Sequence, residues 1–273
     1  MTPLESVVGN MKVGAPLIMG AYGTRNDNPY PIVWLKGTPN GDFITQFALD
    51  VLGFDAQEPD NTENRDARAV GNPNYGCSNI LQFLNAQEEN WFSPMHQYDA
   101  SPARRRMGYA VGYDTHNGFL YHFEDYEIEC LQEDIREVGG NMVRTLIRLP
   151  SAEDVIGDNR FQLFRKRGIR PKGTHDLIAN RSLYIRNLQE ESYIPFWISD
   201  LSTRFNYYAS MINRMGNVDT LYPKECSGIR PVCTIKAETK VELHDDGFYY
   251  IVPTSGRNVF TDGELFELLG LSI

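Results

Sequence analysis

Short apolar segments separated by turn-forming residues are the feature that most limits how this chain can fold. Residues 31–37 (PIVWLKG) and 42–49 (DFITQFAL) flank the turn signal TPNG and predict a β-hairpin. Residues 142–149 (MVRTLIRL) alternate in polarity and predict one half-buried strand. The residues expected on its buried face are Val143, Thr145, Ile147 and Leu149. No run approaches the ~20 apolar residues of a membrane-spanning helix, so we expect no membrane insertion.

Helix signals are few and short. Ser78 is expected to cap a helix in which Ile80, Phe83 and Leu84 form one apolar stripe. Ser151 is expected to cap a second helix with acidic residues in its first turn, where the helix dipole favours them. Residues 53–76 between these strands and helices are expected to form a polar loop. Together with the strands, these signals indicate an α+β chain.

The end of the chain resembles a separate element. Residues 240–252 (KVELHDDGFYYIV) predict a second hairpin with an Asp-Gly turn. Residues 261–270 (TDGELFELLG) carry a capping box and predict a short amphipathic helix, too short to be stable alone in water. We therefore expect one domain over residues 1–237 and a C-terminal hairpin and helix over residues 238–273. The leucines of that helix either pack on the domain itself or dock, as an attachment element, onto copies of the chain or onto another protein.

Charge and cysteine content restrict the partners and the compartment. The net charge of −10 argues against wrapping nucleic acid, which requires a basic face. Two basic runs, 104–106 and 160–172, are interpreted as solvated surface, with a contact to an acidic stretch of another subunit as the alternative. Four cysteines without metal-type spacing indicate free thiols. The first residues lack a signal-peptide pattern, so synthesis in a cytoplasm is expected.

Catalytic motifs are not found in the sequence. It contains no GxSxG elbow, GxGxxG loop or P-loop, and its five histidines lack metal-type spacing. Asp114 and Asn117 offer oxygen ligands that suit calcium, although such loops are usually turns. We predict no catalytic residues, no metal and no cofactor.

Several segments in a fixed order carry a resemblance to a known family. They are residues 31–37, 74–102, 146–155 and 196–236, the last of which contains the motif SGIRPV. Over about residues 13 to 236 the chain resembles a domain family of unknown function from phages and prophages of Gram-positive bacteria. That family is similar to C-type lectins and to formylglycine-generating enzymes.

The resemblance implies a C-type-lectin-like domain, with short helices around a twisted, mostly antiparallel sheet. To this the end of the chain adds a C-terminal strand–helix appendage, which has no counterpart in the family. The scaffold positions that it implies are Trp34, Asn79, Leu84, Asn85, Trp197, Gly228, Arg230 and Pro231. From the residues themselves, Arg230 is expected to be buried and paired with Asp200, because a buried charge is costly without a partner. An oxidase of the related fold would need two converging thiolates for copper, but Cys226 and Cys233 lie on opposite sides of SGIRPV.

The segment between Ser202 and Tyr222 is the candidate ligand-binding surface. It is rich in Asn, Ser, Tyr and Arg, a composition typical of recognition surfaces. The candidate binding residues are Arg204, Asn206, Tyr207, Tyr208, Asn213, Arg214, Asn217 and Tyr222. We therefore expect a non-enzymatic virion protein, displayed on a phage capsid or tail, that binds a host surface glycan or protein and contacts other virion proteins and its own copies. The alternatives are a purely structural cement or adaptor protein and a degenerate relative of the oxidase fold.

Overall fold

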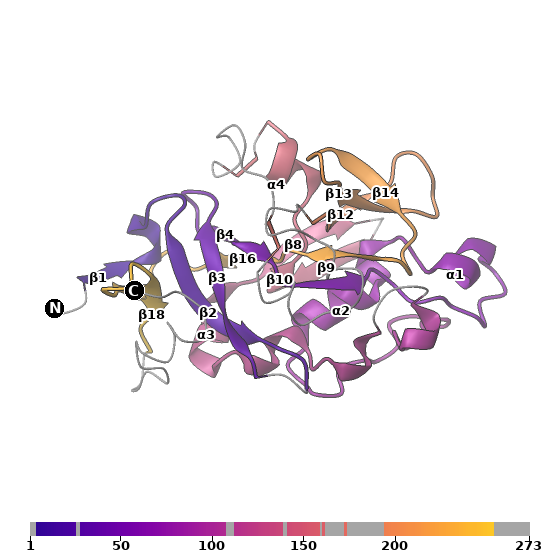
Figure 1. The fold of residues 1–273 in the computed structure, drawn as a ribbon, viewed down its shortest axis with the longest axis horizontal. Coiled ribbons are helices and arrows are strands. Elements are labelled where there is room, and N and C mark those ends of the chain that lie inside the picture. Colours follow the sequence, from indigo (N-terminus) through magenta and orange to yellow (C-terminus); the bar gives the residue numbers. More distant parts are fainter. Residues whose placement is uncertain are drawn as a thin grey trace.

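Two main β-sheets surrounded by short helices make up the fold (Figure 1). The computed structural model describes residues 4–25, 28–107, 112–138, 141–158, 160–161, 172–173 and 194–253. Strands β1, β2, β3 and β18 lie toward one end of the molecule, and β12, β13 and β14 lie toward the other (Figure 1). The predicted α+β class is confirmed.

The first sheet has nine strands within the described residues. In spatial order they are β1 (Leu4–Val7), β17 (Lys240–Leu243), β18 (Tyr249–Ile251), β2 (Pro16–Tyr22), β3 (Tyr30–Lys36), β4 (Asp42–Thr45), β16 (Val232–Ile235) and β10 (Ile147–Arg148), with β7 (Leu131–Gln132) also paired to β16. All neighbours are antiparallel except β18 and β2. The antiparallel β3–β4 pair confirms the hairpin predicted around TPNG.

The second sheet has five strands within the described residues. In order they are β14 (Val218–Leu221), β13 (Ala209–Ile212), β12 (Phe196–Leu201), β15 (Cys226–Ile229) and β6 (Asp50–Gly53). Strand β14 is therefore an edge strand, and the β13–β14 hairpin projects from one side of the sheet. Gly228 in β15 is required by close approach, because a Cβ there would lie 2.7 Å from the Pro195 carbonyl oxygen.

Smaller elements complete the described chain. Two further strand pairs are β5 (Phe47–Ala48) with β11 (Lys172–Gly173) and β8 (Asp134–Val138) with β9 (Asn141–Thr145). The α-helices are α1 (Arg65–Val70), α2 (Asn79–Asn85), α3 (Asp125–Glu129) and α4 (Ala152–Ile156). The 3₁₀ turns are η1 (Val8–Asn10), η2 (Tyr75–Cys77), η3 (Arg104–Arg106), η4 (Tyr113–Thr115) and η5 (Phe119–His122). None of these helices combines the length and apolar character needed to cross a membrane, over the part of the chain described.

The helix caps confirm two predictions, and one short helix was missed. Ser78 accepts a hydrogen bond from Leu81 N at the start of α2, and Ser151 forms a capping box with Asp154 at the start of α4. Helix α1 lies within the stretch expected to be a loop. It begins at Asn64, whose side chain accepts hydrogen bonds from two backbone amides of the first turn.

One large core joins the two sheets. Trp34 of the first sheet and Trp197 of the second are both fully buried, and both belong to this core. Each indole also donates a hydrogen bond to a backbone carbonyl, Trp34 Nε1 to Met19 O and Trp197 Nε1 to Leu52 O. Their predicted role as scaffold residues is consistent with this burial.

Arg230 lies where the chain passes from β15 of the second sheet to β16 of the first, and its guanidinium binds backbone carbonyls there. Its Nε donates to Thr45 O at 2.9 Å and its Nη2 donates to Gln46 O at 3.1 Å. Pro231 O in turn accepts a hydrogen bond from Thr45 N. The segment that links β15 to β16 and the segment at the end of β4 therefore each donate to the other. Burial lowers the pKa of Arg230 to about 10. Arg230 is thus buried as predicted, and it binds these two carbonyls.

The expected Asp200–Arg230 pair needs correction. The Asp200 carboxylate accepts from Ala152 N at 2.6 Å, at the start of α4. Burial raises the pKa of Asp200, and the positive charge that opposes this rise is Arg136. The Asp200 carboxylate therefore accepts a hydrogen bond from the first turn of α4. The guanidinium of Arg230 instead donates to backbone carbonyl oxygens.

The single strand predicted over residues 142–149 is two strands, β9 and β10, interrupted at Leu146. The interruption has a side-chain cause: Asn85 Oδ1 accepts from Leu146 N and Ile147 N, and its amide nitrogen donates to Ile147 O. Arg148, expected on the outer face, is buried and pairs with Asp134 at 3.0 Å and Asp154 at 2.6 Å. The alternating face itself is buried as predicted.

The hairpin predicted over residues 240–252 is present as β17 and β18, with Gly247 at φ 83° in its turn. The hairpin belongs to the first sheet, because β17 pairs with β1 and β18 pairs with β2. A boundary at residue 237 therefore divides a continuous sheet. The predicted helix over residues 261–270 lies outside the described residues.

Candidate functional site

Four aromatic side chains gather beside the β13–β14 hairpin at its open end. They are Phe205, Tyr207, Tyr208 and Tyr222, referred to below as the aromatic face. Tyr208 and Tyr222 are stacked, with ring centroids 4.6 Å apart and planes inclined by 16°. Tyr207 lies 4.7 Å from Tyr208, and Phe205 lies 5.5 Å from both Tyr207 and Tyr208.

Local structure holds the aromatic face in place. The strand β12 ends at Leu201, and Ser202 Oγ then accepts from Arg204 N and Phe205 N, which closes a tight turn. On the other side, β13 and β14 pair Ala209 with Leu221, so Tyr208 and Tyr222 emerge next to each other. A hydrogen bond with Tyr222 raises the pKa of Tyr208 to about 12. The rings are therefore ordered by both backbone and hydroxyl contacts.

The aromatic face is accessible to solvent. Phe205 is 49% exposed, and the flanking Arg204 and Asn206 are exposed as well. Tyr207, Tyr208 and Tyr222 are half-buried. A rigid, partly exposed group of large rings is the kind of surface that recognition proteins use, because it offers apolar area at little cost in rotamer entropy.

The eight predicted binding residues fall into two groups. Tyr207, Tyr208 and Tyr222 belong to the aromatic face, and Arg204 and Asn206 border it. The remaining three, Asn213, Arg214 and Asn217, lie in the tip of the hairpin, beyond the Ile212–Val218 pair at the other end of the strands.

Asn213 has a structural task at that tip. Its Oδ1 accepts from Met215 N and Asn217 N, and its Nδ2 donates to Asp219. Arg214 and Asn217 are exposed there. The structure therefore brings five of the predicted residues together and separates three from them.

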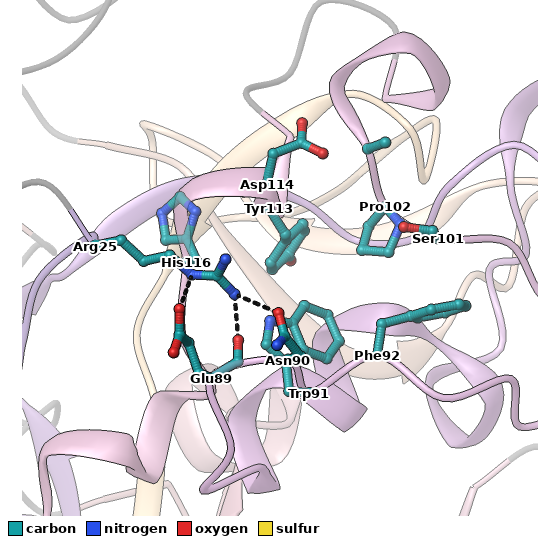
Figure 2. Close-up of a pocket in the computed structure, with 11 residues that line it drawn as sticks. Arg25, Glu89, Asn90, Trp91, Phe92, Ser101, Pro102, Tyr113, Asp114 and His116 are labelled. Atoms are coloured by element: carbon teal, nitrogen blue, oxygen red, sulfur yellow. Dashed lines mark hydrogen bonds and ion pairs between the residues drawn. The ribbon is translucent and has the colours of Figure 1, made fainter.

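A pocket of ≈ 200 Å³ forms a second candidate region, which the sequence did not indicate (Figure 2). In Figure 2, Arg25, Glu89 and His116 lie on one side and Ser101, Pro102 and Phe92 on the other. His116 is buried and its Nε2 lies 3.0 Å from the Asp50 carboxylate, which also accepts from the Tyr22 hydroxyl. The lining residues come from four separate stretches of the chain, so no local motif marks them.

The calcium ligands considered from sequence have other partners. Asp114 Oδ2 accepts from Arg104 N at 2.9 Å, and Asn117 Oδ1 accepts from Arg25 Nε at 3.0 Å. Within the described ranges, no group of three or more His, Cys, Asp or Glu side chains is arranged to hold a metal ion. The loop is therefore organised as a turn in contact with Arg25 and Arg104.

All four cysteines are thiols outside any disulfide, as predicted. Cys226 lies in β15 of the second sheet, and Cys233 lies in β16 of the first. Burial raises the pKa of both thiols, most strongly that of Cys233, and so favours their protonated form. Copper(I) binding would require converging thiolates, an arrangement that these two strands do not provide.

No family model matches the chain, and neither a curated protein nor a solved structure is found to be similar to it.

Proposed function

We propose that this chain is a non-enzymatic recognition protein of a phage particle, which binds a host surface glycan or protein through the aromatic face. The observation that carries the proposal is the ordered stack of Phe205, Tyr207, Tyr208 and Tyr222 beside an edge hairpin. Such rings are costly to hold in water unless a partner covers them, and they supply contact area without further ordering.

The chemistry around the rings suits a glycan in particular. The C–H face of a sugar packs on aromatic rings, while its hydroxyls need donors and acceptors at the margin. The exposed Arg204 and Asn206 provide a guanidinium and an amide there, and the tyrosine hydroxyls provide both roles. A protein partner with an apolar patch is the other occupant that this surface fits.

The phage setting and the lectin-like topology rest on the resemblance of residues 13–236. Short helices around mostly antiparallel sheets are consistent with a C-type-lectin-like fold, and so is the burial of Trp34, Trp197 and Arg230. Contacts with other virion proteins and with copies of the chain form part of the same proposal.

Replacing Tyr207 and Tyr222 by alanine is expected to weaken binding to purified cell walls of the host bacterium. Losing two central rings should cost about 2 kcal/mol or more, roughly a 30-fold fall in affinity. Co-sedimentation of the full chain with walls, over a range of protein concentrations, measures this change.

The matched control is Asn217→Ala at the exposed tip of the same hairpin. It should leave wall binding unchanged, and both variants should keep the thermal midpoint of the parent protein. Equal binding by the Tyr207→Ala/Tyr222→Ala protein and its parent would refute the role of the aromatic face.

Membership of the particle is a separate expectation. Mass spectrometry of purified virions should detect peptides of this chain in amounts that remain constant through repeated density-gradient steps. Peptides found in the infected cell lysate but lost from purified virions would contradict the display role, while leaving wall binding by the isolated protein untouched.

A further inference from the structure

We infer that the pocket in Figure 2 binds one neutral, polyhydroxylated ring of monosaccharide size. This inference does not rest on the aromatic face, because none of its residues lines the pocket. The argument proceeds from the size of the pocket, its charges, its hydrogen-bonding groups and the rigidity of its walls.

Size limits the ligand to a small molecule. The pocket holds ≈ 200 Å³, below the roughly 300–1,000 Å³ typical of pockets for drug-sized ligands. Its walls include Trp91, Phe92 and Tyr113, against which one face of a ring can pack. A single six-membered ring fits these limits better than an oligomer or a nucleotide.

Charge favours a neutral ligand. Arg25 Nε lies 3.7 Å from the Glu89 carboxylate, and Asp114 supplies a second negative charge to the lining. A carboxylate would be opposed by Glu89 and Asp114, and an ammonium group would have to displace Arg25 from the Glu89 carboxylate. A ligand without net charge avoids both penalties.

The polar groups match hydroxyls, which both donate and accept hydrogen bonds. Arg25 donates through Nε to Asn117 and through Nη2 to Glu89 O and Asn90 Oδ1, while its Nη1 takes part in none of the contacts within the described residues. Asn90 accepts through Oδ1, which leaves its amide nitrogen as a donor. The lining thus offers both kinds of group: Arg25 Nη1 and Asn90 Nδ2 as donors, the Glu89 and Asp114 carboxylates as acceptors, and the Ser101 hydroxyl as either.

The walls are preorganised. Trp91 and Tyr113 meet edge to face at 5.4 Å, and the Tyr113 hydroxyl donates to Gly53 O. His116 is held by the buried Asp50 carboxylate. Because contacts within the chain hold these side chains, binding would require little further loss of entropy.

The test uses glucose, galactose and N-acetylglucosamine as probes of the full-length protein, with saturation-transfer NMR as the readout. At least one sugar should receive saturation. The Ala103→Phe substitution fills the pocket and should lower the affinity for that sugar about tenfold or more. This is the change expected when ring contacts or a hydrogen bond are lost. The control, Ala69→Phe on the exposed surface of α1, should leave its affinity unchanged.

Fluorescence gives an independent readout of the location. The chain has three tryptophans, of which Trp34 and Trp197 are fully buried and Trp91 lines the pocket. Sugar binding should change the emission of the parent protein, and Trp91→Phe should abolish that change.

Three results would overturn the inference. They are the absence of saturation transfer to all three sugars, binding that survives Ala103→Phe unchanged, and tighter binding of glucosamine or glucuronate than of the neutral sugars. The Tyr207→Ala/Tyr222→Ala protein should still bind the pocket ligand. An experiment that refutes sugar binding in the pocket can therefore be distinguished from one that refutes binding by the aromatic face.

Discussion

Arg230→Ala is expected to lower the free energy of unfolding by about 3–5 kcal/mol. Two charged hydrogen bonds, to Thr45 O and Gln46 O, are lost where the chain crosses between the sheets. The guanidinium also lies 5.9 Å from the centroid of the Phe196 ring, so truncation removes packing as well. No longer burying a charge offsets part of this loss, which is why the expected value is not larger.

Urea denaturation measures this change, provided that the slope of the transition stays constant. Arg230→Met is the matched variant, because it keeps most of the side-chain volume and lacks the hydrogen-bond donors. It should lower the free energy of unfolding by less than Arg230→Ala does. A well-folded Arg230→Ala protein within 1 kcal/mol of its parent would show that the two carbonyls do not need the guanidinium.

Trp197→Ala is expected to lower the free energy of unfolding by about 3–5 kcal/mol, because removing a fully buried indole leaves a cavity between the two sheets. Trp197 packs edge to face on Phe54 at 5.4 Å and donates to Leu52 O at 2.8 Å. Trp197→Phe keeps the ring contact and loses the donor, so we expect it to fall between the parent protein and Trp197→Ala.

Trp91→Phe is the control variant, because it shows how much stability is lost when an indole elsewhere in the chain is replaced by a phenyl ring. Trp91 borders the pocket and packs edge to face on Tyr113, whereas the Trp197 indole donates a hydrogen bond to Leu52 O, so Trp91→Phe should cost less than Trp197→Phe. Thermal or urea midpoints of the three variants provide the comparison. Equal losses at Trp91 and Trp197 would contradict the central position assigned to Trp197.

Local signals predicted the elements whose cause is local. Ser78 and Ser151 cap helices through their own side chains, and the turns at residues 38–41 and 245–247 lie between strands that pair directly. Helix α1 had a signal too, since Asn64 is a strong capping residue, but six residues give little apolar periodicity to read.

Long-range contacts decided what sequence could not. Asn85 interrupts a strand that begins 56 positions later (Asn141 minus Asn85), and Arg148 is buried where Asp134 of β8 and Asp154 of α4 both pair with it. The choice of Thr45 and Gln46 as partners of Arg230 likewise depends on how two sheets are joined. Composition indicated the aromatic face, whereas the pocket was missed because its residues meet only in the folded chain.

The most direct measurement of the central claim is NMR of the protein carrying ¹³C-labelled tyrosine, titrated with solubilised host wall polysaccharide. The chain has 15 tyrosines, and single Tyr→Phe variants assign the three of the aromatic face. The account predicts that the ring signals of Tyr207, Tyr208 and Tyr222 shift together and saturate, while that of the buried Tyr75 stays in place. Polysaccharide binding that leaves all three signals unchanged would contradict it.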